Sequence, residues 1–165
     1  MNSLFEIKVC GINDEISMNT ALKCKVNYIG FVFYPNSPRN ISINQSRELL
    51  QSRNKNTKIV ALTVDPNDDF LFEIKNEIKP DYIQLHGNEN PNRCRYIKKN
   101  LNIPIIKGIN VKNKLNLMQL TTDFEDICDI LLLDAPSEDL PGGNGKKFDW
   151  DILKDFKSKK KWMLA

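Results

Sequence analysis

The sequence predicts an α/β protein of the (β/α)8 barrel (TIM barrel) class, with about seven strands and six helices along its 165 residues. Three observations predict this fold. Apolar runs alternate with helix-like segments in units of about 20 to 30 residues, which is typical of consecutive βα units around a parallel sheet. The runs are apolar almost throughout, as in strands that are covered on both faces. Polar or reactive residues follow several of the runs, and in a barrel these strand ends converge on one mouth.

The first predicted strand, Glu6 to Ile12, is a short β-branched run that stops at a cysteine followed by a glycine. Side chains alternate along a strand, so Lys8 and Cys10 share one face. If that face lines a pocket, the Lys8 ammonium would favour the Cys10 thiolate, and a cysteine so placed could remove a proton. The alternative is that Cys10 is a small buried hydrophobe, because free cysteine is among the most buried residue types.

Six further apolar runs predict the remaining strands. They lie at 28–33, 58–64, 82–86, 104–109, 129–134 and 161–165. Several of them end at a turn signal, such as Pro66 after the third strand and Gly87 after the fourth. The last run stops with the chain.

Cap residues and helical spacing predict six helices between these strands. They run from Asn13 or Asp14 to about Cys24, from Ser42 to about Arg53, over 67–79, 91–99 and 114–123, and from 148–150 to about Lys157. Leu71, Ile74 and Ile78 recur at helical spacing in the third helix. Pro91 suits the first turn of the fourth.

The residues at the strand ends favour a barrel over a doubly wound sheet. Cys10, His86 and Asp134 lie at the ends of the first, fourth and sixth strands, and Arg39 lies on the loop after the second. A doubly wound sheet concentrates its function at one switch point, usually beside a glycine-rich turn after the first strand. The turn here, 10–13, lacks the Gly-x-Gly-x-x-Gly pattern, which counts against a dinucleotide-binding fold.

Composition indicates one globular domain over residues 1–165, which we expect in the cytoplasm. Hydrophobic residues make up 41% and charged residues 27% of the chain, and the net charge is +3. The basic run from Lys154 to Lys161 is interpreted as a solvated helix end, because a nucleic-acid interface needs a wider basic stripe. No apolar stretch approaches the ~20 residues that span a bilayer, and the amino terminus lacks a signal-peptide pattern. We therefore expect no nucleic-acid partner and no membrane partner.

Metal binding is not predicted. The four cysteines, Cys10, Cys24, Cys94 and Cys128, form no Cys-x-x-Cys pair. The chain has one histidine, so the usual ligand set of a structural zinc site is missing.

Five motifs occur in order along nearly the whole chain. They are Lys8-Val9-Cys10-Gly11-Ile12, Gly30-Phe31-Val32-Phe33-Tyr34 with Ser37-Pro38-Arg39, Gln84-Leu85-His86-Gly87, Leu132-Leu133-Asp134-Ala135, and Gly142-Gly143-Asn144-Gly145-Lys146 with Phe148-Asp149-Trp150. Together they resemble the motifs of the phosphoribosylanthranilate isomerase family of tryptophan biosynthesis. Each motif alone is weak, but their order and spacing make the resemblance specific.

The resemblance implies a (β/α)8 barrel that acts on a small phosphosugar substrate without metal or cofactor. The family converts N-(5-phosphoribosyl)anthranilate to 1-(2-carboxyphenylamino)-1-deoxyribulose 5-phosphate by an Amadori rearrangement. One group protonates the ribose ring oxygen, and another removes the proton from the neighbouring sugar carbon. By resemblance Asp134 is the acid and Cys10 is the base. In the family the position of Arg39 binds the anthranilate carboxylate or lies beside it, and the positions of Gln84 and His86 face the substrate.

The same residues also have structural interpretations. Asp134 could cap the loop after its strand, Arg39 could be a surface arginine, and His86 could be a capped structural residue. The glycines at 142–145 suggest a phosphate loop, but they follow the sixth strand, and we expect a mobile loop over the mouth instead. Pro136 stands where many relatives carry a lysine after the Asp-Ala pair.

Relatives in this family continue past the position of Ala165 into a Gly-Gly pair, a helix, an eighth strand and the residues that hold the phosphate. We therefore expect a C-terminally truncated, incomplete barrel that lacks its last βα units. Two functions stay open, the isomerase and a non-catalytic remnant that acts as a binding or assembly partner. A related phosphate-binding barrel, such as indole-glycerol-phosphate synthase, ranks below both because its lysine-rich catalytic pattern is not visible. The sequence leaves open whether the chain is a monomer or a homodimer.

Overall fold

Strands and helices alternate along the chain, as the sequence predicts. The computed structural model describes residues 5–135 and 149–165, and in them seven strands follow one another in the sheet in sequence order, β1 to β7. The chain divides into two compact units, Met1–Ile83 and Gln84–Ala165. Among the residues described, no helix is both long enough and apolar enough to cross a bilayer.

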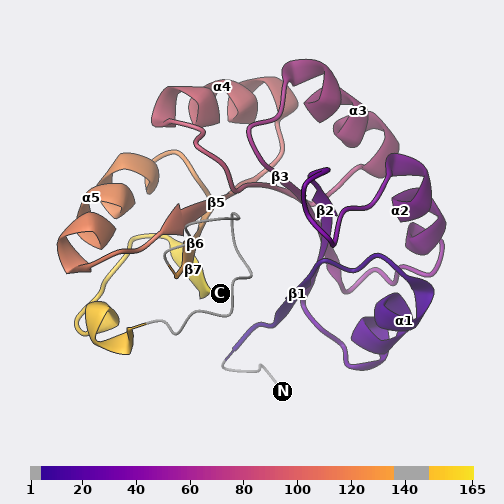
Figure 1. The fold of residues 1–165 in the computed structure, drawn as a ribbon, viewed down its shortest axis with the longest axis horizontal. Helices are drawn as coiled ribbons and strands as arrows, with labels where there is room; N and C mark the ends of the chain where they lie inside the picture. The colour runs from indigo at the N-terminus through magenta and orange to yellow at the C-terminus, as the bar shows by residue number, and fades with distance from the viewer. Residues whose placement is uncertain (1–4, 136–148) are drawn as a thin grey trace. The chain divides into compact units, whose positions relative to one another are not determined.

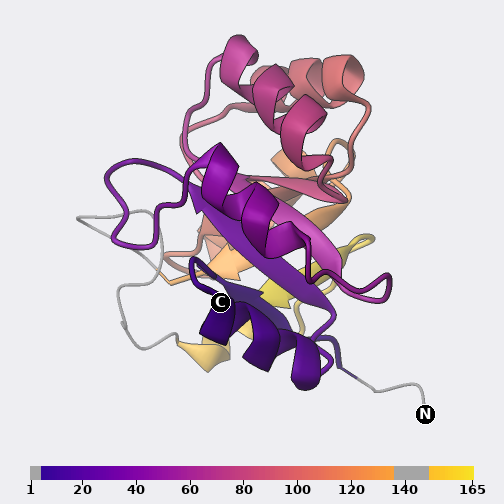
Figure 2. The same cartoon turned by 90° about the vertical axis from the view of Figure 1, so that its right-hand side faces the viewer.

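The first unit is built from three βα units (Figure 1). Its elements are β1 (Lys8–Cys10), α1 (Glu15–Lys23), β2 (Tyr28–Phe33), α2 (Ile43–Leu50), β3 (Lys58–Thr63) and α3 (Asp68–Ile78). β1 pairs with β2 and β2 with β3, both in parallel. α1 and α2 lie on the same face of the β1–β2 pair (Figures 1 and 2).

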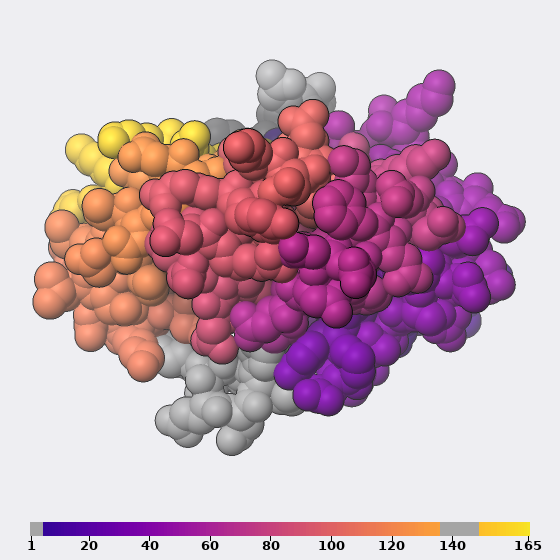
Figure 3. Space-filling model, turned by 90° about the horizontal axis from the view of Figure 1, so that it is seen from above, coloured from indigo at the N-terminus to yellow at the C-terminus, as the bar shows by residue number. Residues whose placement is uncertain are grey.

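The second unit continues the same alternation. β4 (Tyr82–Leu85) spans the boundary. It is followed by α4 (Pro91–Leu101), β5 (Ile105–Asn110), α5 (Lys114–Phe124), β6 (Ile130–Asp134), a 3-10 helix η1 (Trp150–Leu153) and β7 (Lys161–Leu164). β5 pairs with β6 and β6 with β7, again in parallel. Figure 3 shows the outer surface of α4 and, next to it, that of α5.

The inner strands β2 to β6 bury most residues on both of their faces, whereas β1 is half-buried and β7 is half-buried or exposed. Every residue of β2 and of β6 is buried. Helix residues at helical spacing complete the core of each unit, Met18, Leu71 and Ile74 in the first and Cys94, Ile97 and Leu117 in the second. Each large apolar side chain buried in this way stabilises the fold by about 1.5–3 kcal/mol.

The predicted cap residues begin α1 and α2. Asp14, not Asn13, caps α1 by accepting a hydrogen bond from the Ser17 backbone N–H. Ser42 forms a complete capping box with Gln45 at the start of α2. Asparagine caps α3, α4 and α5 in the same way. Because capping is local chemistry, the helix starts were predictable to within about one residue.

The prediction of a sixth helix up to about Lys157 is wrong. The structure has only η1 here, so the described residues contain five α-helices and one short 3-10 helix. Asp155 adopts the left-handed backbone conformation with φ +64°, which a continuing α-helix does not allow. The residues beyond it are rich in lysine and present no apolar stripe that packing could stabilise.

Candidate active site

β1 ends at Cys10 because the next residue turns the chain. Gly11 has φ +89°, a conformation that favours glycine. The backbone N–H groups of Gly11 and Ile12 both donate to the Gly30 carbonyl, at 2.8 and 3.2 Å. This turn places the Cys10 thiol at the carboxyl end of its strand, as predicted.

The space around the Cys10 thiol depends on a glycine in the neighbouring strand. Cys10 is paired in register with Gly30 of β2. A Cβ added at Gly30 would lie 2.8 Å from the Cys10 Sγ and 3.3 Å from its Cα. The half-buried thiol therefore occupies the space that any side chain at position 30 would need.

Arg39 lies over the glycine that follows Cys10. A Cβ added at Gly11 would overlap the Arg39 Cδ, so the stem of the arginine lies directly over Gly11. The Tyr34 N–H donates to the Asn40 Oδ1 at 2.9 Å and closes the loop that carries the arginine. Arg39 is exposed, and none of the described acidic residues pairs with its guanidinium. The guanidinium is available to bind a carboxylate.

The second unit brings together three of the predicted site residues. The His86 Nε2 lies 3.2 Å from the Asp134 Oδ2, and the His86 Nδ1 lies 2.8 Å from the Gln84 Nε2. His86 and Asp134 are 9% and 6% exposed. The Gln84 amide nitrogen donates to Nδ1, so the proton of a neutral imidazole is on Nε2, from which it is donated to Asp134.

A second glycine makes room for the imidazole. A Cβ added at Gly108 on β5 would lie 2.6 Å from the His86 Nδ1 and within 3.1 Å of two further ring atoms. The arrangement repeats the one at Gly30, where a strand glycine leaves room for a reactive side chain on the neighbouring element.

Lys107 and Glu89 form a buried ion pair close to His86 that the sequence analysis did not single out. The Lys107 Nζ lies 2.8 Å from the Glu89 Oε2, and both side chains are almost fully buried. The available signal was a lysine inside an otherwise apolar strand, because lysine is almost never fully buried unless it is paired. Its partner could not be recognised from local sequence.

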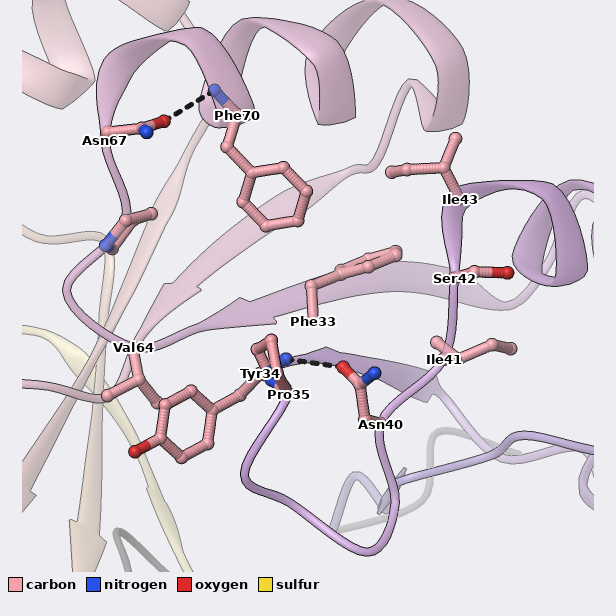
Figure 4. A pocket seen from close by; sticks show the side chains of 11 residues that line it. Phe33, Tyr34, Pro35, Asn40, Ile41, Ser42, Ile43, Val64, Asn67 and Phe70 are labelled. Atoms are coloured by element: carbon pink, nitrogen blue, oxygen red, sulfur yellow. Dashed lines mark hydrogen bonds between the residues drawn. The ribbon is translucent and has the colours of Figure 1, made fainter.

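A separate pocket of about 450 Å³ lies at the carboxyl ends of β2 and β3 (Figure 4). Phe33 and Phe70 meet edge to face across it, with ring centroids 6.3 Å apart. Its walls are mostly apolar, and none of the described residues that line it is a cysteine, histidine, lysine, aspartate or glutamate. Such a lining suits an apolar group.

Hydrogen bonds thus bring Gln84, His86 and Asp134 together in the second unit. Cys10 and Arg39 lie in the first unit, each against a glycine and without a recorded contact between them. The remaining predictions, the glycine-rich loop at 142–145 and Pro136, lie outside the described residues. No group of three potential metal ligands occurs in the described part of the chain. A thiol and a buried carboxyl at strand ends can exchange protons with a substrate.

Comparisons of the sequence with known proteins point to one family. The family model of N-(5'-phosphoribosyl)anthranilate (PRA) isomerase matches residues 7–165. The N-(5'-phosphoribosyl)anthranilate isomerase of Chelativorans sp. (strain BNC1) is 36% identical over 163 residues, which cover 97% of this chain and 74% of the relative.

Solved structures of the same enzyme share the fold. Phosphoribosyl anthranilate isomerase from Thermotoga maritima matches with a TM-score of 0.86 at 24% identity, over 98% of this chain and 77% of that one. A second structure, in complex with reduced 1-(o-carboxyphenylamino)-1-deoxyribulose 5-phosphate, matches with a TM-score of 0.77 at 24% identity, over 92% and 69%. From the match of the family model and the identity to its curated relative, this chain belongs to the N-(5'-phosphoribosyl)anthranilate isomerase family.

Proposed function

We propose that this chain isomerises N-(5-phosphoribosyl)anthranilate to 1-(2-carboxyphenylamino)-1-deoxyribulose 5-phosphate in tryptophan biosynthesis, by general acid/base catalysis without metal or cofactor. The observation that carries the proposal is the buried Asp134 at the end of β6, whose Oδ2 lies 3.2 Å from the His86 Nε2. A neutral carboxyl in that position can act as the acid that the ring opening requires.

The reaction divides into two proton transfers. Asp134 donates its proton to the ribose ring oxygen, the bond from that oxygen to the anomeric carbon breaks, and an iminium forms on the anthranilate nitrogen. Cys10, as thiolate, then removes the proton from the neighbouring sugar carbon, and the electron pair of that bond neutralises the iminium. The resulting enolamine becomes the ketone when the anomeric carbon gains a proton and the hydroxyl on the neighbouring carbon loses one. The Cys10 thiol then returns its proton and Asp134 regains one, so both groups end in their starting forms. Atoms and charge balance without an oxidant, as an isomerisation requires.

The other predicted residues bind the substrate. Arg39 binds the anthranilate carboxylate, because its exposed guanidinium offers a planar pair of donors. Gln84 and His86 face the substrate beside the buried Asp134 carboxyl. A relative of known structure was solved with reduced 1-(o-carboxyphenylamino)-1-deoxyribulose 5-phosphate, which supports a phosphosugar ligand.

We further propose a (β/α)8 barrel for the whole sheet, a cytoplasmic location, a monomer or homodimer, and no nucleic-acid or membrane partner.

Turnover of N-(5-phosphoribosyl)anthranilate by the purified 165-residue chain tests the proposal. Cys10→Ala and Asp134→Asn each remove one proton-transfer group, and each is expected to lower kcat about 10²–10⁴-fold. Cys24→Ala and Asp126→Asn are the matched controls, since both residues are exposed and neither belongs to the site. The controls are expected to turn over substrate like the wild-type chain.

Two outcomes would contradict the proposal in different ways. Wild-type turnover in Cys10→Ala or Asp134→Asn would show that the base or the acid is assigned to the wrong residue. A folded wild-type chain that binds the reduced product but does not turn over substrate would support a binding function instead.

A further inference from the structure

Lys107 points away from the face of β5 that meets His86, and it uses all of its hydrogen-bond donors. Its neighbour Gly108 faces His86, and side chains alternate along a strand, so Lys107 projects from the opposite face. Its Nζ donates to the Glu89 Oε2 at 2.8 Å, to the Gly87 carbonyl at 2.8 Å and to the Leu85 carbonyl at 3.4 Å. An ammonium has three N–H donors, so this lysine has none left for a substrate.

The acceptors of Lys107 lie on both sides of His86 in the chain. Leu85 precedes the histidine and Gly87 follows it. Glu89 completes the arrangement, because its Oε2 also accepts the Gly87 N–H at 2.9 Å. Both backbone polar groups of Gly87 are therefore held by the same ion pair, one by each partner.

Stability alone does not explain this pair. Burial removes both charges from water, and the desolvation penalty of a buried ion pair often cancels the attraction between the charges. Apolar residues of similar volume are frequently at least as stabilising. An apolar pair cannot form hydrogen bonds with the backbone. The ion pair does so on both sides of His86, whose imidazole contacts Gln84 and Asp134.

We propose that the Lys107–Glu89 ion pair is a positioning device for His86, which fixes the backbone at Gly87 so that the imidazole reaches Gln84 and Asp134 together. Lys107 and Glu89 are positioning residues and touch no substrate. The link to catalysis rests on the proposed isomerase function, whereas the link to the imidazole geometry does not.

The variant Lys107→Met/Glu89→Met tests the proposal, since it replaces both charges by apolar side chains of similar volume. Its matched control is Lys98→Met/Asp129→Met, which removes the ion pair at the opposite end of β5. The control also removes the acceptor of one backbone N–H, that of Ile105, as the test variant does for Gly87.

The readout is the imidazole itself. The chain contains one histidine, so in a ¹⁵N-histidine spectrum every imidazole signal comes from His86. The wild-type chain and the control are expected to show the tautomer with the proton on Nε2. The test variant is expected to show a mixture of tautomers, with kcat lowered about 10²-fold and KM changed much less.

A folded test variant with the wild-type tautomer and the wild-type kcat would overturn the proposal. If that variant does not fold, amide hydrogen exchange at Gly87 in the wild-type chain decides. Exchange as slow as in the core of β5 is expected, and fast exchange would show that Gly87 is not held. An inactive wild-type chain with the expected tautomer would refute the isomerase function and leave the positioning role intact.

Discussion

At the scale of single residues, two strand glycines shape the candidate site. Gly30 leaves room for the Cys10 thiol, and Gly108 leaves room for the His86 ring. In both cases the built Cβ would come within 3 Å of a functional atom, closer than real Cβ atoms come. These two glycines are required by close approach, since neither has a positive φ; among the described glycines that conformation occurs at Gly11.

Gly108→Ala is expected to move the imidazole out of its contacts with Gln84 and Asp134, because a ring cannot yield as a flexible chain does. Overpacking of this kind costs about 1–3 kcal/mol of unfolding free energy. Turnover should fall, and the ¹⁵N-histidine spectrum should change. Gly30→Ala is the matched comparison, since it presses on the thiol and should lower turnover without altering the histidine spectrum. A Gly108→Ala chain with wild-type activity and spectrum would show that the ring has room to move.

At the scale of elements, reciprocal backbone clamps hold the amino ends of paired strands. The Asn27, Asp81 and Asp129 side chains accept from the N–H groups of Ile7, Ile59 and Ile105, respectively, and each returns its own N–H to the carbonyl of the same isoleucine. The clamped residues lie at or just before β1, β3 and β5. These clamps therefore lie at the amino ends of the strands and the proposed proton-transfer groups at the carboxyl ends, a division that is typical of barrel enzymes.

The cap of α1 predicts a dependence of stability on pH. The side-chain hydrogen bond from Ser17, followed by its backbone N–H, lowers the pKa of Asp14 below 3.8. A carboxyl whose pKa is lower in the folded chain stabilises that chain above its unfolded pKa, and this contribution is lost as the pH falls through the folded pKa. Asp14→Asn keeps a cap oxygen but does not titrate.

The unfolding free energy of the wild-type chain, measured with urea, should exceed that of Asp14→Asn by a constant amount above about pH 5. The difference should shrink as the pH falls further. If the difference in unfolding free energy is the same at about pH 3 as at about pH 7, the pKa of Asp14 does not change on folding.

At the scale of the whole molecule, the four cysteines occupy distinct environments. Cys24 is exposed and Cys10 half-buried, whereas Cys94 and Cys128 are fully buried. The hydrogen bond to Cys94, together with burial, raises the pKa of the Cys128 thiol. The thiolate is the form that reacts with alkylating reagents, so the rate of alkylation of each cysteine should follow the burial and the pKa of its thiol in the folded chain.

Alkylation of the native chain should modify Cys24 and Cys10 quickly, and Cys94 and Cys128 only at the rate at which the chain unfolds. Mass spectrometry of the labelled peptides measures this directly. In denaturant all four cysteines should react at comparable rates, which serves as the control. Fast labelling of Cys128 without denaturant would mean that the second unit opens locally.

Local chemistry in the sequence determined the order of strands and helices, the helix caps and the predicted site residues at or near strand ends. Apolar runs and capping side chains act within a few residues, so Asp14, Ser42, Cys10 and Asp134 could be recognised without knowledge of the fold. The assignment of proton-transfer roles came from the resemblance to a family and stays a prediction for this chain.

Only the tertiary structure decided which side chains meet. Lys107 and Glu89 are separated by 18 residues, and His86 and Asp134 by 48. Contacts at such separations depend on strand register and on the space that Gly108 leaves, neither of which follows from a local pattern. The 3-10 helix after Trp150 shows the same limit, because short-range periodicity predicted a longer helix than backbone conformation and packing support.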